Sequence, residues 1–297
     1  MPDICIVSDS KPGHLNQSLG LVEALQRLRP DVRYKLCAPQ SWRALSWVLI
    51  RHLFNKRSLP PTKLIIAAGH RTHVTMLIYG WLSGAKTVLL MKPSLPSRYF
   101  DLCLIPEHDQ PVESSNIIET WGVLNRMVPA QKKAGTGLLL IGGPSKHFNW
   151  DEQSVLDQLS SVLAKYPQLD WSLTTSRRTP SAFLTELQKR KLKVKLIPHE
   201  ETELNWLPQT LAITEHCWVT QDSVSMVYEA LTAGCDVGLI TLSNNGEGRL
   251  HHGLARLRAA NRVSSLQQPA LRDPETVLIP LAEAQRCAAL ILEKGWL

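Results

Sequence analysis

Residues 222–234 combine the groups that proteins use to hold a nucleotide diphosphate. Asp222 and Ser223 are typical N-cap residues, the apolar residues after them recur at helical spacing, and Gly234 is placed to end the helix. Amide groups at the start of a helix bind anions such as phosphate. Glu229 follows nearly two turns later, where its carboxylate can bind a ribose diol. The alternative is a well-capped structural helix with Glu229 in solvent.

Another polar stretch, from Asp9 to Ser18, follows a predicted strand over 4–7. Gly13 permits a tight turn, and His14 comes shortly before a predicted helix over 17–28. A histidine titrates near neutral pH and can accept the proton of an attacking hydroxyl. We therefore interpret His14 as the catalytic base. The alternative is a histidine that only orients its loop.

The loop 69–73, Gly-His-Arg-Thr-His, follows a predicted strand over 64–68. Its arginine can attract an anionic acceptor, although a solvated loop would have the same composition. The residues predicted to lie on the acceptor side are Lys11, Gly13, Asn16, Gln17, Gly69 and Arg71.

Three further loops offer groups for a sugar-nucleotide donor. The glycine pair in 142–147 lets a backbone approach a ligand closely, the hydroxyls and arginines of 174–179 suit a diphosphate, and the amides at 244–245 suit a sugar. The alternatives are ordinary turns and surface charge. The residues predicted to bind the donor are Gly142, Gly143, Ser145, Lys146, Ser176, Arg177, Asp222, Ser223, Glu229, Asn244 and Asn245.

Several site classes have no signature in this chain. It contains no Asp-x-Asp, no His-Glu-x-x-His and no clustered ligand set, so we expect no metal site. The P-loop spacing is missing from 142–147, and a Gly-x-Gly-x-x-Gly fingerprint is absent. The absence of the Gly-x-Gly-x-x-Gly fingerprint counts against a hydride-transfer enzyme.

Composition favours a globular protein with an acidic ligand. The 297 residues include 33 Lys and Arg against 26 Asp and Glu, which gives a net charge of +7. No dense basic tract with interleaved aromatic residues occurs, so a nucleic-acid partner is not expected. Six scattered cysteines, the absence of a leader and the absence of a long apolar run predict a cytoplasmic protein without a disulfide framework.

Strand and helix signals alternate through both halves of the chain. Strands are predicted at 4–7, 34–37, 64–68, 86–91 and 102–105, and again at 138–141, 171–175, 194–197 and 237–240. This rhythm predicts an α/β protein with two Rossmann-like domains whose parallel sheets face a cleft. The turn-rich stretch 107–135 and a linker at 132–137 predict one domain at 1–130 and another at 136–297. The last helix of the chain could cross back to the first domain.

The segment 43–57 is a basic amphipathic helix in this interpretation. Trp47, Ile50, Leu53 and Phe54 can share one face, with four basic residues around it. Such a helix packs into its own domain or, as the minority alternative, lies on anionic lipid, which would make the protein peripheral on the inner face of a membrane.

Four motifs together resemble the plant mitochondrial-fission factor family and its bacterial homologues. They are 11–21 (KPGHLNQSLGL), 142–146 (GGPSK), 174–180 (TTSRRTP) and 220–226 (TQDSVSM), and the resemblance covers nearly the whole chain. The fission role of that family implies an interaction or scaffold protein.

More distantly, the layout resembles the GT-B glycosyltransferases, in particular the UDP-GlcNAc lipid-intermediate transferase of peptidoglycan synthesis. Gly13-His14 is similar to the Gly-His that ends its N-terminal loop, and 229–234 (EALTAG) is similar to its Glu-x-Ala-x-Ala-Gly helix, whose glutamate binds ribose. This chain departs in having one glycine in the N-terminal loop where that enzyme has several, and an Asn pair where it has a Gln pair.

The leading hypothesis is a metal-independent GT-B-type glycosyltransferase. It implies a nucleotide-diphosphate sugar as co-substrate, with UDP-sugars first in line, no further cofactor, and an envelope or lipid-linked glycan as acceptor of a hexosyl or N-acetylhexosaminyl group. The alternatives are a non-catalytic interaction or scaffold protein with the same fold, and a sugar-nucleotide epimerase or hydrolase.

Overall fold

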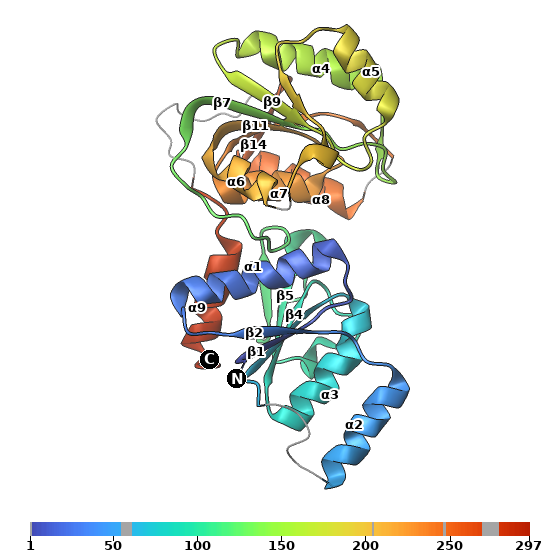
Figure 1. Cartoon of the computed structure of the whole chain (residues 1–297), viewed down its shortest axis with the longest axis vertical. Coiled ribbons are helices and arrows are strands. Elements are labelled where there is room, and N and C mark those ends of the chain that lie inside the picture. Colours follow the sequence, from blue (N-terminus) through green and yellow to red (C-terminus); the bar gives the residue numbers. More distant parts are fainter. Residues whose placement is uncertain (1, 55–60, 204, 246–247, 269–278) are drawn as a thin grey trace. The chain divides into compact units, whose positions relative to one another are not determined.

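Two parallel β-sheets organise the chain in its computed structural model, which describes residues 2–54, 61–203, 205–245, 248–268 and 279–297 (Figure 1). The chain divides into two compact units. Unit 1 comprises Met1–Arg126 together with Ala282–Leu297, and unit 2 comprises Met127–Leu281. The sequence-based division at 1–130 and 136–297 therefore differs from the structural one chiefly in the last sixteen residues, 282–297, which belong to unit 1.

The sheet of unit 1 has the strand order β2-β1-β3-β4-β5-β6, and every neighbouring pair is parallel. Its strands are β1 (Ile4–Val7), β2 (Tyr34–Cys37), β3 (Leu64–Ala68), β4 (Lys86–Leu90), β5 (Leu102–Pro106) and β6 (Ile117–Thr120). Central strands such as β1 and β3 are apolar throughout because both faces of a parallel sheet are covered.

Helices cover both faces of this sheet. They are α1 (Pro12–Leu28), α2 (Trp42–Phe54), α3 (His73–Ser83) and α9 (Glu283–Glu293), with short 3₁₀ helices at His70–Thr72, Ser97–Tyr99 and Glu107–Asp109. Along β1, Ile4 and Ile6 join the core under α1 and α9, whereas Cys5 and Val7 join the core under α3. This alternation follows from the two-residue period of a strand.

Unit 2 repeats the architecture with the strand order β10-β9-β7-β11-β12-β14, again parallel throughout. The strands are β7 (Lys133–Leu140), β9 (Asp170–Thr174), β10 (Lys195–Ile197), β11 (Thr214–Thr220), β12 (Asp236–Ile240) and β14 (Val263–Ser265). A separate antiparallel pair joins β8 (Phe148–Asn149) to β13 (Ser243–Asn244).

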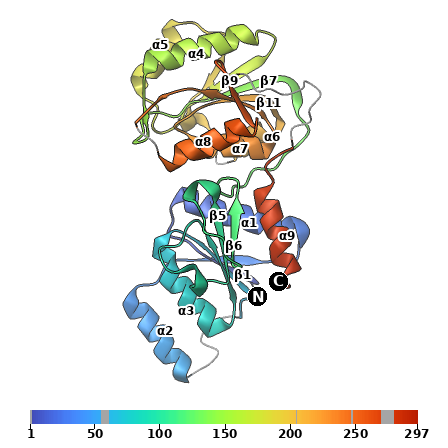
Figure 2. The same ribbon diagram turned by 180° about the vertical axis from the view of Figure 1, so that it is seen from behind.

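The helices of unit 2 form two layers around its sheet. They are α4 (Glu152–Lys165), α5 (Ser181–Lys189), α6 (Trp206–Ile213), α7 (Val224–Ala233) and α8 (Arg249–Ala259), with a 3₁₀ helix at His199–Glu201. Helices α4 and α5 cover one face, and α6, α7 and α8 cover the other (Figures 1 and 2).

Two sequence predictions about these elements are wrong. Helix α1 begins at Pro12 and not at Gln17, because a proline suits the first turn of a helix, so Gly13, His14 and Asn16 are helical. The predicted linker 132–137 mostly belongs to β7, which begins at Lys133. Its pairing with β11 is irregular, and Gly135 adopts a left-handed φ of 76°, which explains its linker-like composition.

Candidate functional site

Each sheet has a point where its strand order reverses. In open parallel sheets, ligands bind beyond the carboxyl ends of the strands at such a switch point. The switch lies between β1 and β3 in unit 1 and between β7 and β11 in unit 2. The predicted catalytic loop follows β1, and the predicted donor loops follow β7 and β11, so the strongest sequence candidates lie at the two switch points.

At the switch point of unit 1, His14 is paired with Asp9. The Nδ1 atom of His14 lies 3.0 Å from Oδ1 and 3.1 Å from Oδ2 of Asp9, whose side chain is 3% exposed. Burial alone would raise the pKa of Asp9, but hydrogen bonds from His14 and from the Lys11 amide lower it below the ordinary value. An ionised Asp9 holds the proton of His14 on Nδ1, which leaves Nε2 as the atom that can accept a proton.

Gly69, at the end of β3, makes room for this pair. A Cβ atom on Gly69 would lie 2.5 Å from both Cε1 and Nδ1 of His14, and the residue has a left-handed φ of 87°. Gly69 therefore seats the His14 ring. By contrast, Gly13 lies in the first turn of α1 with open space beside it, so it does not form the tight turn expected of it.

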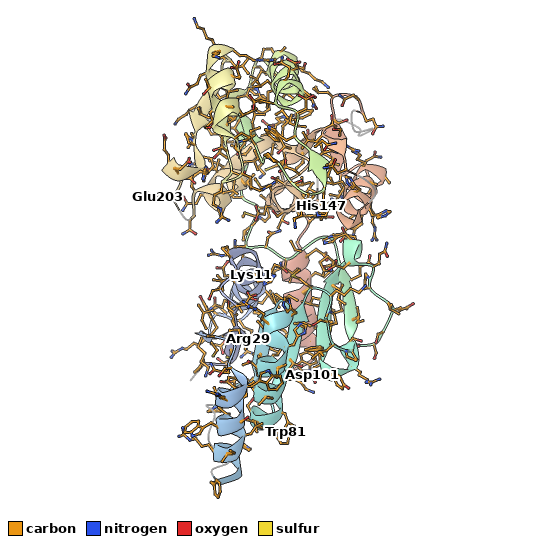
Figure 3. All side chains as sticks on the ribbon, turned by 90° about the vertical axis from the view of Figure 1, so that its right-hand side faces the viewer. Lys11, Arg29, Trp81, Asp101, His147 and Glu203 are labelled. Atoms are coloured by element: carbon orange, nitrogen blue, oxygen red, sulfur yellow. The ribbon has the colours of Figure 1, made fainter. Side chains whose placement is uncertain are left out.

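The other predicted acceptor-side residues divide into exposed and buried ones. Lys11 is exposed at the start of α1, with Nζ 4.0 Å from Oδ2 of Asp9 (Figure 3). Asn16 and Arg71 are also exposed. Gln17 is buried, and its amide donates to the sulfur of Met91 over 3.5 Å within unit 1.

At the switch point of unit 2, the carboxylate of Asp222 is fully buried and joins two loops. Its Oδ2 atom accepts hydrogen bonds from the Gly143 amide at 3.0 Å and from the Ser223 hydroxyl at 3.2 Å. The guanidinium of Arg178 lies 2.6 Å from the same oxygen. Asp222 is thus an internal partner of the loop after β7 and cannot itself contact a phosphate.

Arg178 completes this connection, which we call the loop clamp: Gly143, Arg178, Asp222 and Ser223. The Arg178 guanidinium donates to the carbonyl oxygens of Gly143 and Pro144 and to the hydroxyl of Ser223. The predicted phosphate ligand, Arg177, is also exposed but takes no part in the clamp. The arginine that reaches the start of α7 is therefore Arg178 and not Arg177.

The glycine pair of this loop is explained by packing. A Cβ atom on Gly142 would collide with the side chains of Asp222 and Ser223, and one on Gly143 would collide with the Arg178 backbone. The structure therefore explains both glycines by the close approach of neighbouring loops, with no need of a ligand.

The remaining predicted donor residues mostly shape their own loops. The Ser145 hydroxyl accepts from the amides of His147 and Phe148, and the Ser176 hydroxyl accepts from the Arg178 amide. Lys146 and Asn245 are exposed, and the Asn245 amide donates to the His147 carbonyl. Asn244 pairs in β13, and its side chain lies outside the described part of the structure.

Helix α7 nevertheless keeps free donors for an anion. Ser223 is its N-cap, as predicted, but its hydroxyl makes no capping hydrogen bond, and Gly234 ends the helix in the left-handed conformation. The first intrahelical bond runs from the Val227 amide to the Ser223 carbonyl. The amides of residues 224–226 therefore have no acceptor within the helix, and Ser225 beside them is exposed.

Glu229 lies on the same helix and is partly buried. Burial raises the pKa of its carboxyl from 4.5 to about 7. A carboxylate in such a position binds two hydroxyls strongly, because hydrogen bonds replace the water that it has lost.

This pKa predicts that stability falls as pH rises. Between pH 4.5 and about 7 the unfolded chain loses the Glu229 proton while the folded chain keeps it, so the free energy of unfolding decreases, by up to about 3 kcal/mol. Glu229→Gln should remove this decrease in urea titrations at successive pH values, whereas Glu186→Gln, at a side chain that is 47% exposed, should keep it. An unchanged slope in Glu229→Gln would contradict the assignment.

A cavity of about 580 Å³ lies beside the ends of β11 and β12. Helix α8 contributes His251, His252 and Arg258 to its wall, and Gln221 and Thr241 come from the strand ends. The Nε atom of Arg258 is buried and has no hydrogen-bond partner, and burial lowers the pKa of this guanidinium. The sequence did not point to the residues of α8, because this helix carries no motif.

The sequence matches a known protein family over nearly its whole length. Residues 12–294 match the family model described as "Mitochondrial fission ELM1". The chain belongs to this family. The resemblance predicted from the four motifs of the ELM1-family protein is therefore confirmed. Among curated proteins, the uncharacterized protein RP120 of Rickettsia prowazekii is 24% identical to this chain over 291 residues. The match covers 78% of this chain and 81% of RP120.

Solved structures similar to this ELM1-family protein include two with a GT-B-like fold. MurG of Acinetobacter baumannii has a TM-score of 0.51 at 11% identity, covering 99% of this chain and 100% of its own. The UDP-GlcNAc 2-epimerase of Neisseria meningitidis, solved with UDP-GlcNAc bound, has a TM-score of 0.54 at 10% identity and covers 99% of both chains. The predicted α/β fold class of GT-B type is confirmed.

Three further findings concern the described residues of this ELM1-family protein. No helix among them is both long and apolar enough to cross a bilayer. No group of three or more His, Cys, Asp or Glu side chains within those same ranges could hold a metal ion. All six cysteines are free thiols, five of them buried.

Proposed function

We propose that this protein is a glycosyltransferase that moves a sugar from a nucleotide-diphosphate donor to a hydroxyl group of a glycan or lipid-linked acceptor. The observation that carries the proposal is the Asp9–His14 pair at the switch point of unit 1. A binding protein has no need of a histidine whose Nδ1 proton is fixed by a buried carboxylate. A base that removes a hydroxyl proton needs both its orientation and its tautomer fixed.

In this proposal, Nε2 of His14 accepts the proton of the acceptor hydroxyl while the hydroxyl oxygen attacks the anomeric carbon of the donor. The bond from that carbon to the diphosphate breaks, and the diphosphate leaves with the bonding electron pair. The ionised Asp9 stabilises the imidazolium that forms, since it lies 3.0 Å from Nδ1.

The donor is assigned to unit 2. The free amides of residues 224–226 would bind the diphosphate, and the positive end of the α7 dipole would stabilise its growing charge. Glu229 would hold the ribose hydroxyls. The similar Neisseria epimerase binds UDP-GlcNAc, which supports a UDP-sugar as the first donor to try.

A thermal-shift screen with UDP-, GDP-, ADP- and CMP-sugars tests the donor half of this proposal. A ligand at one hundred times its Kd stabilises the native state by about 2.7 kcal/mol, so the correct donor should raise the melting temperature by several degrees. Glu229→Ala should lose the shift. Glu186→Ala removes a half-exposed carboxylate from the same unit and should keep the shift.

Product analysis then separates transfer from the other activities of this fold. A transferase releases nucleotide diphosphate only when an acceptor is present. Release without acceptor would indicate a hydrolase, and a changed sugar on an intact nucleotide would indicate an epimerase. No shift with any sugar nucleotide would favour an interaction protein and would overturn the proposal.

A further inference from the structure

Helix α2 has apolar residues on two opposite faces, but only one of them is covered. Leu45 is buried, and Val48 and Leu49 are partly buried. On the outer side, Trp47 is 59%, Ile50 is 54% and Phe54 is 88% exposed. These three residues follow one another at i, i+3 and i+7, so they form one row along the helix.

A contiguous row of exposed apolar side chains indicates an interaction surface more strongly than scattered apolar residues do. Single exposed leucines or valines are common, whereas contiguous exposed aromatic and aliphatic side chains mark interaction sites. Burying a side chain of this kind contributes a favourable free energy in proportion to the apolar area removed from water. Helix α2 also begins with Trp42, which is exposed as well.

The sequence around this row carries only positively charged residues. Residues 32–100 contain eleven Lys and Arg and no Asp or Glu. At the chain's average frequency of 26 acidic residues in 297, this stretch would contain about six. The stretch therefore carries a charge of +11, and the rest of the chain carries −4, which gives the total of +7. The surplus of positive charge is confined to the segment that contains α2.

Two arginines of α2 flank the apolar row. Arg43 and Arg51 are exposed, one turn before and one turn after Trp47, and the Arg51 guanidinium lies 5.3 Å from the centre of the Trp47 ring. Neither forms an ion pair with any acidic residue in the described ranges. An arginine stacked on a tryptophan with its charge uncompensated is the arrangement expected at a lipid headgroup layer.

The neighbouring helix α3 adds another aromatic side chain. Trp81, near the end of α3, is 76% exposed, and Figure 3 shows it at the same end of unit 1 as α2. Tryptophan is enriched where a membrane meets water, because its ring is apolar and its N–H remains hydrated.

We propose that the outer face of α2, formed by Arg43, Trp47, Ile50, Arg51 and Phe54, docks on the surface of a bilayer rich in anionic phospholipid. The apolar row enters the boundary between headgroups and acyl chains, and the arginines bind phosphate groups. The thirteen residues of α2 are too few to span a bilayer, so the helix lies in the plane of the surface. A protein partner is disfavoured because it would need a long acidic surface to match the acid-free segment.

Vesicle co-sedimentation tests this assignment with the full-length protein. Binding is compared for vesicles of phosphatidylcholine alone and vesicles of an equimolar mixture of phosphatidylcholine and phosphatidylglycerol. The protein should bind the mixed vesicles and not the neutral ones, and added salt should weaken binding. Arg43→Gln and Arg51→Gln should each lower the affinity about fivefold, because each arginine near the surface contributes about 1 kcal/mol.

Phe54→Glu should lower the affinity at least about tenfold, since it removes an inserted side chain and adds a negative charge. Val112→Glu is the matched control, because Val112 is 77% exposed, also lies in unit 1 and is outside α2. Circular dichroism should show both variants folded.

Three outcomes would overturn the proposal. They are no binding to the mixed vesicles, equal losses in Phe54→Glu and Val112→Glu, and a wild-type oligomer that Phe54→Glu converts to a monomer, which would make this face a self-association surface. None of these outcomes bears on the proposed transferase, whose donor assay needs no lipid.

Discussion

Replacement of His14 by alanine is expected to lower the turnover of donor and acceptor about 10²- to 10⁴-fold, which is the usual contribution of a general base. The reason is that no other group with a fixed tautomer occupies this position at the end of β1. Donor affinity should not change, because the donor is assigned to unit 2. Initial rates with the sugar nucleotide found by thermal shift, together with calorimetric affinities, separate these two effects.

Two further variants examine how His14 is positioned. Asp9→Asn removes the charge that stabilises the imidazolium and so should slow turnover, while the protein should bind donor normally. Gly69→Ala places a methyl group 2.5 Å from the His14 ring and should displace it, with a similar loss of rate. His70→Ala removes an exposed histidine from the adjacent loop and is the matched control. Full turnover in His14→Ala would contradict the assignment.

The second large effect is expected on stability. Asp222→Ala should destabilise unit 2 by about 1–3 kcal/mol, because it leaves the buried Gly143 amide without its acceptor and removes the ionic partner of the Arg178 guanidinium. Urea unfolding gives the total loss. Hydrogen exchange locates it, since the Gly143 amide should exchange much faster than in the wild type.

The ion pair between Asp157 and Arg190 provides the control for Asp222. The Asp157 carboxylate lies 2.7 Å from Arg190 but is largely exposed, so Asp157→Ala should cost less than about 1 kcal/mol. The comparison holds residue type and partner type constant and changes burial. Equal losses in the two variants would show that the loop clamp does not hold unit 2 together.

Element type was predictable from the sequence because burial on both faces makes the central strands apolar throughout. Strands such as β1, β3 and β12 follow directly from this pattern. The start of α1 was misjudged because Gly13 and His14 are weak helix formers, and a proline at the first position outweighs them. The start of β7 was missed because Gly135 interrupts the apolar pattern with a left-handed residue.

The location of the candidate site was predictable, and the roles of its residues stay predictions. Strand ends are visible in sequence, and therefore His14, Gly69 and Ser223 could be placed after β1, β3 and β11, with Glu229 on the helix that follows. Which of two adjacent arginines reaches the start of α7 depends on the path of the loop, so Arg178 could not be told from Arg177. The same limit applies to Asp9, which was seen in the loop but whose pairing with His14 depends on the geometry of the α1 start.

The most direct test of the central claim is a crystal structure of the protein with the stabilising sugar nucleotide soaked in. We predict that the diphosphate lies against the amides of residues 224–226 and that the ribose hydroxyls contact the Glu229 carboxylate. A nucleotide bound elsewhere in unit 2, with the start of α7 left to solvent, would contradict the account.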